Sequence, residues 1–236
     1  MTAATTMVSL DRVGVHYGKV AALRDVSLNI ERGDVVALIG ANGSGKTTLL
    51  QALHGVVAHT GTRSVPQDAT AQAMVFQRPF MMRLSVWNNL QLALWLAGVP
   101  SGTRAARAAE ALERAGLSAL RDRQARALSG GQQQRLALVR AWATRPTVLL
   151  LDEPTANLDP SAKKEVETLL ASFAADGMTL VMSTHNLGQA KRLATRVVYL
   201  DRGEIRADLP TARFFGEHLD GRADLFLKGE LTWDTY

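Results

Sequence analysis

Apolar residues along this chain gather in short runs, and the spacing within each run predicts two kinds of β-strand. Residues 8–17 and 26–30 alternate apolar and polar side chains, a pattern typical of antiparallel strands that bury one face. The runs at residues 35–39, 148–151 and 180–182 are apolar at every position, as strands buried on both faces of a parallel sheet are. The chain is therefore expected to combine an N-terminal antiparallel part with a buried parallel sheet.

Helical periodicity fills the stretches between the buried strands. Residues 46–54, 162–175 and 187–195 follow the helical pattern, and the first two stretches end close to Gly55 and Gly177. Glycine there suits the left-handed residue that commonly closes a helix. This alternation predicts the α/β class, with a mixed sheet and an antiparallel N-terminal β subdomain.

The middle of the chain differs, because helical patterns follow one another there without a strand between them. They cover residues 85–97, 103–115 and 131–144, and glycines separate them. We expect residues 84–130 to form a helical subdomain inserted into the α/β core. A length of 236 residues suits a single domain of this kind.

Composition narrows the possible chemistry more than charge does. The chain has no cysteine, which excludes a disulfide framework, a cysteine zinc site and a thiol nucleophile. The net charge of +5 comes from 27 basic and 22 acidic residues that are interspersed, so charge favours no particular partner. No secretory signal pattern is expected at the N-terminus, and the most apolar stretch, residues 90–100, is too short to span a bilayer. At a membrane, the chain is expected to act as a peripheral subunit.

The most specific motif follows directly after the strand predicted at residues 35–39. Residues 40–47 match the phosphate-loop pattern G-x-x-x-x-G-K-[ST] and precede a predicted helix. Glycines let successive backbone N–H groups face a polyphosphate, and the helix N-terminus adds partial positive charge. Lys46 is expected to reach the β- and γ-phosphates, and the Thr47 hydroxyl to ligate Mg²⁺. The expected nucleotide-binding residues are Gly40, Ala41, Asn42, Gly43, Ser44, Gly45, Lys46, Thr47 and Thr48.

Two carboxylates follow the apolar run at residues 148–151. Asp152, at the carboxyl end of that strand, is expected to face the phosphate loop and hold Mg²⁺. Glu153 would lie beyond the γ-phosphate, where a carboxylate can orient and deprotonate the attacking water. An isolated Asp-Glu pair usually starts a solvated loop, but the phosphate loop makes the catalytic interpretation the stronger one.

A third motif, Leu128-Ser129-Gly130-Gly131-Gln132, stands just before a predicted helix. A serine and two glycines at a helix N-terminus can bind an anion, although a plain N-cap with a glycine turn is also common. One fold rarely needs two such anion sites for a single nucleotide. The second site is therefore expected to serve a nucleotide held by another subunit.

With these motifs in this order, residues 7–205 resemble the ATP-binding cassette (ABC) ATPases. The phosphate loop is similar to the family's Walker A motif, Asp152-Glu153 to Walker B and residues 128–132 to the signature motif. The resemblance implies roles for four further features. Tyr17 would stack on adenine, and the Q-loop glutamine Gln77 would contact Mg²⁺ and the attacking water. The D-loop Asn157-Leu158-Asp159 would contact the partner subunit, and the switch histidine His185 would contact the γ-phosphate.

The resemblance also implies how the chain is divided. Residues 7–83 and 131–205 correspond to the nucleotide-binding core, residues 84–130 to the helical subdomain and residues 206–236 to a C-terminal extension. Only 31 positions separate Lys46 from Gln77, which is short for the family. The antiparallel region between them, at residues 56–72, is therefore expected to be trimmed.

ABC ATPases drive transporters or act as soluble enzymes, and the sequence leaves both classes open. The DNA-repair type needs a long coiled-coil insertion, and no heptad array is present. The translation type carries two cassettes, whereas one is visible here, and a cluster-assembly ATPase or an exporter cassette remains an alternative. Apolar residues after Gln77 favour transport, because they could form a groove for a helix of a membrane subunit. These residues are Phe80, Met81, Met82, Leu84, Val86 and Trp87.

The resemblance points to the ATPase subunit of a bacterial importer at the cytoplasmic face of the inner membrane. Its implied partners are a second copy of the chain in an ATP-dependent head-to-tail dimer, transmembrane permease subunits and a periplasmic or lipid-anchored solute-binding protein, and no nucleic acid. Gln77-Arg78-Pro79 and residues 81–85 resemble importers of oxyanions such as tungstate and phosphate, with polar amino-acid importers next.

Overall fold

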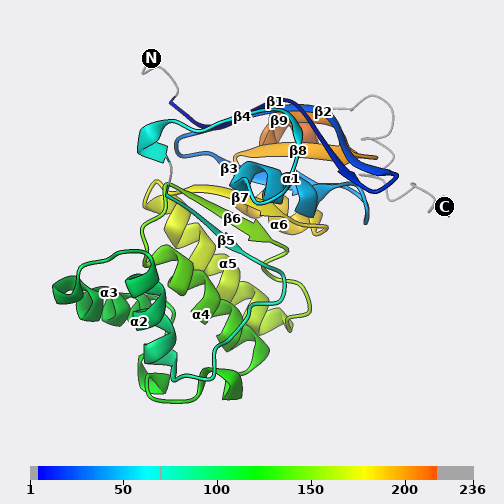
Figure 1. Ribbon diagram of the computed structural model, residues 1–236. Coiled ribbons are helices and arrows are strands. Elements are labelled where there is room, and N and C mark those ends of the chain that lie inside the picture. Colours follow the sequence, from blue (N-terminus) through cyan, green and yellow to red (C-terminus); the bar gives the residue numbers. More distant parts are fainter. Residues whose placement is uncertain (1–4, 70, 217–236) are drawn as a thin grey trace.

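A computed structural model describes residues 5–69 and 71–216, which form two β-sheets with helices around them (Figure 1). The smaller sheet has three antiparallel strands, in the order β2 (Val20–Glu31), β1 (Thr6–Tyr17) and β4 (Thr60–Ser64). The alternating patterns at residues 8–17 and 26–30 are thus confirmed as antiparallel strands. In the short region at residues 56–72, the structure has β4 and a single 3₁₀ turn, Gln67–Ala69.

The larger sheet has six strands. Its order is β5 (Gln72–Val75), β6 (Val148–Asp152), β7 (Thr179–Ser183), β3 (Val35–Ile39), β8 (Arg196–Asp201) and β9 (Glu204–Pro210). All neighbours are parallel except the antiparallel pair β8 and β9. Every residue of β3, β6 and β7 is buried, which confirms the strands predicted from continuous apolar runs. The mixed α/β fold is therefore as expected. Strands β8 and β9 also belong to this sheet, although the apolar pattern did not predict them.

Helices cover the two faces of the larger sheet differently. On one face, α1 (Lys46–His54) lies between the six-stranded sheet and the antiparallel sheet, in a core shared by all three. On the other face lie α4 (Gly130–Trp142), α5 (Pro160–Ala175) and α6 (Leu187–Leu193). Helix α6 ends before residue 195, because the Thr195 N–H already donates to the Val35 carbonyl at the entrance to β8.

Residues 86–142, which end with α4, form the lower lobe in Figure 1. Helices α2 (Val86–Leu96) and α3 (Ser101–Arg114) pack beside α4 without a strand between them. Two short 3₁₀ turns, Ser118–Leu120 and Ala125–Ala127, lead into α4. The serines Ser85 and Ser129 cap α2 and α4 by accepting a hydrogen bond from the first turn of each helix.

The C-terminal end of the described chain continues the sheet. Strand β9 is followed by the short helix α7 (Thr211–Gly216), in which Phe214 is buried. The rest of the expected C-terminal extension, residues 217–236, lies outside the described residues. Within residues 5–69 and 71–216, no helix is long and apolar enough to cross a membrane.

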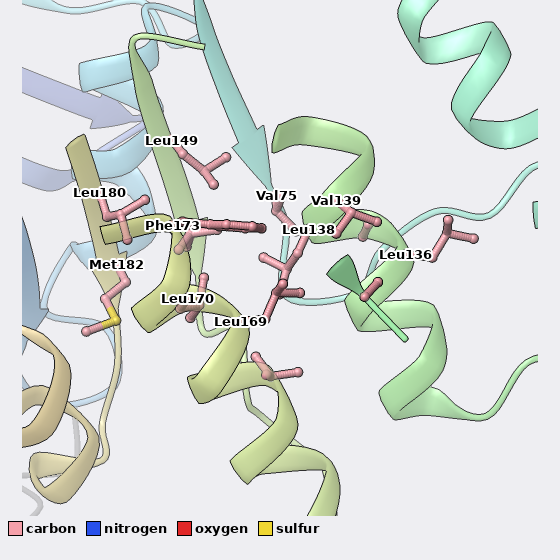
Figure 2. Close-up of a cluster of buried hydrophobic side chains, with 14 of the residues drawn as sticks. Val75, Leu136, Leu138, Val139, Leu149, Leu169, Leu170, Phe173, Leu180 and Met182 are labelled. Carbon is pink, nitrogen blue, oxygen red and sulfur yellow. The ribbon is translucent and has the colours of Figure 1, made fainter. Parts of the chain in front are cut away.

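A single aromatic residue anchors the contact between the sheet and the lower lobe. Phe173 of α5 is fully buried among strand residues such as Leu149 and Leu180 and α4 residues such as Leu138 (Figure 2). The ring of Trp142 stacks on it at 5.7 Å between centroids. Burial of an aromatic side chain of this size stabilises the packing of α4 and α5 on the sheet.

We expect Phe173→Ala to lower the free energy of unfolding by about 3–5 kcal/mol, because it leaves a cavity under both helices. Leu96→Ala is the matched control, since Leu96 is 70% exposed and its truncation should change stability by about 0.5 kcal/mol or less. Denaturant unfolding midpoints measure both. Equal losses for the two variants would contradict this assignment of the core.

Candidate functional site

The phosphate loop connects β3 to α1 and depends on glycines in conformations that other residues rarely adopt. Gly40 and Gly45 have φ angles of 152° and 104°. A side chain at Gly45 would also collide with the chain, because its Cβ would lie 2.6 Å from the Ala22 carbonyl oxygen. Glycine at these positions therefore lets the loop wrap closely and turn its backbone N–H groups inward.

Lys46 places a positive charge inside this loop. Its Nζ donates hydrogen bonds to the carbonyls of Gly40 and Ala41, each at 2.9 Å. Burial lowers the pKa of Lys46, and the nearby carboxylates of Glu153 and Asp152 oppose that shift. An ammonium group desolvated in this way binds an added anion strongly, because little water competes for it.

Ser44 provides a second polar group inside the loop. Its side chain is buried, and its Oγ has no hydrogen-bond partner among the described residues. A buried hydroxyl without a partner is unfavourable unless something else binds it. Together with Lys46 and the N-terminus of α1, it forms a cradle suited to a polyphosphate.

Three oxygen-bearing side chains meet beside the loop. The Thr47 hydroxyl lies 3.0 Å from both carboxylate oxygens of Asp152, and the Ser183 hydroxyl donates to Asp152 Oδ1 at 2.6 Å. A hydroxyl and a carboxylate next to a phosphate cradle fit Mg²⁺, which takes few protein ligands and completes its shell with phosphates and water. Thr47 and Asp152 are the residues that would hold the ion, where it would neutralise phosphate charge.

Glu153 joins two of the predicted site residues. Its Oε2 lies 3.2 Å from Nδ1 of His185 and accepts a hydrogen bond from Nε2 of Gln77 at 3.4 Å. The three residues follow β6, β7 and β5, which are neighbours in the sheet, so the carboxyl ends of parallel strands bring them together. The imidazole is mostly exposed, at 63%, whereas the Glu153 side chain is 17% exposed. The group thus borders the Asp152 site and faces outward.

The loop that carries Gln77 is held mainly by side chains from the lower lobe. Among residues 5–69 and 71–216, the backbone of residues 78–83 makes no hydrogen bond to another backbone group. Arg140 donates to the Phe80 carbonyl at 3.0 Å, Arg126 to the Met81 carbonyl at 3.0 Å, and buried Asn89 bonds to both backbone groups of Met82. The helices beside the signature therefore set the position of this loop.

The structure does not support the whole groove that is expected from the apolar residues after Gln77. Met81 and Val86 are buried in the core, so they cannot line an open groove. Trp87 is partly buried and packs against the same core. Phe80 remains 68% exposed, and Phe76 before it is 52% exposed, although the sequence analysis did not single Phe76 out.

Tyr17 lies at the end of β1, beside the helix that the phosphate loop opens. Its hydroxyl donates to Oε1 of Gln51 in α1 at 3.2 Å, and the residue is 51% exposed. An exposed aromatic ring at this place is available for stacking.

The motif at residues 128–132 is not brought to the phosphate loop. Ser129 and Gln132 form a capping box at the start of α4. A Cβ on Gly131 would lie 2.6 Å from the Cβ of Ala162, so this glycine allows α4 to pack against α5. Asp159 caps α5 by accepting from the Ala162 N–H at 3.0 Å. Within the described part of the chain, no hydrogen bond joins residues 128–132 to residues 40–47.

Ser183 belongs to the site, although the sequence analysis did not name it. It bonds to Asp152 and also accepts the Glu153 N–H at 2.9 Å. It lies opposite Asp152 in the parallel register of β6 and β7. A hydroxyl at the carboxyl end of a predicted buried strand was the available signal, but using it required knowledge of the strand order.

The comparisons with known proteins all give matches to the same family. The family described as ABC transporter matches residues 23–156. The glutamine transport ATP-binding protein GlnQ of Bacillus subtilis (strain 168) is 37% identical over 236 residues, with 94% of this chain and 98% of GlnQ covered. The glutamate/aspartate import ATP-binding protein GltL of Escherichia coli (strain K12) is 35% identical over 236 residues, with the same coverage.

Solved structures give a similar result. The structure of cbiO1 from Clostridium perfringens, part of the transporter complex cbiONQ, has a TM-score of 0.81 at 27% identity, covering 90% of this chain and 92% of that one. A dimeric, post-hydrolysis structure of the ATP-binding cassette MJ0796 bound to ADP and Pi has a TM-score of 0.75 at 30% identity, covering 87% and 99%. These relatives do not support the expected resemblance to oxyanion importers, because GlnQ and GltL are named for amino acids.

Proposed function

This chain belongs to the ABC transporter family as an ATP-hydrolysing subunit, and we propose that it drives the import of a polar amino acid. The observation that carries the catalytic part is the contact of Glu153 with His185 at 3.2 Å and with Gln77 through a hydrogen bond, beside the Thr47–Asp152 pair. Charge on a bound triphosphate would lie between Lys46 and this group.

The proposed chemistry assigns one step to each part of the site. A water oxygen forms a bond to the γ-phosphorus, the bond to the bridging oxygen breaks, and ADP leaves. Glu153 orients that water and accepts its proton, while Gln77 positions the same water. Lys46 and the loop N–H groups bind the phosphates, and exposed His185 is placed to contact the γ-phosphate. Mg²⁺ held by Thr47 and Asp152 would supply charge neutralisation.

Glu153→Gln is expected to lower kcat by at least about a hundredfold while ATP binding stays near its original value, because the base acts in the transition state. Lys46→Ala should instead weaken ATP binding itself, by about tenfold or more, because it removes a buried charge from the phosphates. Steady-state ATPase assays and nucleotide titration separate the two effects.

Glu110→Gln is the control, since Glu110 is an exposed carboxylate of α3. It should leave both quantities unchanged. If Glu153→Gln weakened ATP binding as much as it slowed hydrolysis, Glu153 would not be the base.

We also propose that a second copy of the chain completes each ATP site. Ser129 and Gly130 begin a helix in the lower lobe, and no hydrogen bond among the described residues links them to the phosphate loop. In a head-to-tail dimer, the N-terminus of α4 in one copy would bind the triphosphate held by the other, and Asp159 would lie at the contact. The ATP-binding cassette MJ0796, whose structure is dimeric, supports the pairing of two copies.

With Mg·ATP, the Glu153→Gln variant is expected to form a dimer, whereas ADP should leave it monomeric, because the triphosphate links the two copies. Adding Ser129→Arg should abolish this dimer without preventing ATP binding to the monomer. Mixing the Ser129→Arg and Lys46→Ala chains should restore part of the ATPase activity through one complete site. Light scattering measures the assembly.

Ser85→Arg is the matched control, because Ser85 is also an N-cap serine of the lower lobe but lies outside the signature. The Glu153→Gln, Ser85→Arg chain should still dimerise. A monomer at saturating Mg·ATP in the Glu153→Gln variant would contradict the shared site.

The remaining partners follow from the exposed surface and from the relatives. Phe80 and Phe76 are exposed next to the Gln77 loop and provide an apolar contact for a permease subunit. A permease contact places the chain at the cytoplasmic side of the membrane as a peripheral subunit, and import implies a solute-binding protein outside. GlnQ and GltL, which are named for amino-acid transport and import, support this assembly over a soluble or exporting one.

In cells that lack this subunit, uptake of labelled glutamine or glutamate is expected to fall and to return with the original chain but not with Lys46→Ala. Tungstate uptake, measured in parallel, should not change. Loss of tungstate uptake with normal amino-acid uptake would overturn the proposed solute class.

A further inference from the structure

The turn that carries Glu153 is held in a conformation that its residues do not favour. Glu153 has φ 43° and Asn157 has φ 59°, both in the left-handed region. Asn adopts this region fairly readily, but Glu does so rarely. Inside the turn, a single backbone hydrogen bond, from Ala156 N–H to the Glu153 carbonyl, is formed. Such a conformation persists only where neighbouring groups hold it.

Those neighbours are residues on either side of His185. Ser183, two positions before it, accepts the Glu153 N–H at 2.9 Å. Gln189, four positions after it, donates from Nε2 to the Thr155 hydroxyl at 3.0 Å. The segment at residues 183–189 therefore holds the turn at its first residue and at its middle, while the imidazole between the two anchors lies 3.2 Å from the Glu153 carboxylate.

The Gln189 anchor is buried and incompletely satisfied. Gln189 has no exposed surface, Thr155 is 6% exposed, and Oε1 of Gln189 has no hydrogen-bond partner among the described residues. Its backbone N–H is bonded to the Asn186 side chain, which begins α6. A buried amide oxygen without a hydrogen-bond donor lowers the stability of the fold. The presence of Gln189 is therefore better explained by the hydrogen bond with which it positions Thr155 than by packing.

We infer that Gln189 is a positioning residue for hydrolysis, which sets the place of Glu153 relative to His185 through the Thr155 hydroxyl. The inference rests on the proposed function, because it assigns Glu153 its role as base. Among the described residues, no hydrogen bond joins Gln189 to the loop that binds phosphate or to the side chains of Glu153, His185 and Gln77. Its loss should therefore misplace Glu153 and leave nucleotide binding intact.

The test uses steady-state ATPase kinetics of the full chain with Mg·ATP. Thr155→Val keeps the shape of the side chain and removes its hydroxyl, whereas Thr155→Ser keeps the hydroxyl. We expect Thr155→Val and Gln189→Leu to lower kcat about tenfold with KM within about twofold, and Thr155→Ser to keep at least about half of kcat. The double variant Thr155→Val, Gln189→Leu should be no slower than the slower single variant, because both remove one link.

Gln91→Leu is the matched control, since Gln91 donates a comparable hydrogen bond to the Arg104 carbonyl at 3.3 Å, far along the lower lobe. It should keep kcat. A Thr155→Val chain with kcat within twofold of the original, or a Thr155→Ser chain as slow as Thr155→Val, would overturn the inference.

The Thr155 pair decides the question by itself if Gln189→Leu fails to fold. An original chain without Mg-dependent ATPase activity would refute the proposed function instead, so the two failures are distinguishable.

Discussion

The parallel register of β6 and β7 is the constraint on which the site depends. Both strands are buried along their whole length, and a slip by one residue would turn every side chain to the opposite face of the sheet, where the core is packed around other side chains. In this register Asp152 lies opposite Ser183, whose hydroxyl bonds to both Asp152 and the Glu153 N–H. The packing of the hydrophobic core thereby determines the positions of the Asp152 and Glu153 carboxylates. The carboxyl ends of these two strands therefore set the positions of the site residues that follow them.

Electrostatics then make this edge suitable for a polyphosphate. Lys46 is buried among backbone carbonyls of its own loop, and burial lowers its pKa despite two carboxylates nearby. The Ser44 hydroxyl beside it has no hydrogen-bond partner in the described part of the chain. A desolvated cation and an unpartnered hydroxyl cost free energy by themselves, and an anion that binds them offsets this cost. The loop is thus built for its ligand more than for the stability of the chain.

The lower lobe is coupled to this edge by packing and by side-chain hydrogen bonds. Gly131 of the signature approaches Ala162 of α5, which follows directly after the D-loop residue Asp159. Arg140, from the same helix α4, holds the loop that leads to Gln77. A displacement of α4 would therefore shift both the D-loop and the loop that carries Gln77. The start of α4 is thereby linked by packing and hydrogen bonds to the loop that carries Gln77.

Local chemistry was enough to predict the elements whose signals lie within a few residues. The helix at residues 46–54 matched α1, because the glycine loop before it and Gly55 after it mark both ends. The parallel strands followed from continuous apolar runs. Helix α5 began two residues earlier than expected, because the cap formed by Asp159 and Pro160 was not considered. Strands β8 and β9 were missed because the run at residues 196–201 is separated from α6 by only two residues and no residue of β9 is fully buried.

The candidate site divides in the same way. Lys46, Thr47, Asp152 and Glu153 were found from their own motifs, whereas Gln77, His185 and Tyr17 were found only through resemblance to a family, since a single glutamine, histidine or tyrosine carries no local signal. Ser183, Thr155 and Gln189 came from neither source. Their importance arises from contacts of β6 and the turn after it with β7 and α6, which lie about thirty residues further along the chain. Motif chemistry is local and can be predicted from the sequence, but hydrogen bonds between strands and loops depend on strand order and register, which only the folded core decides.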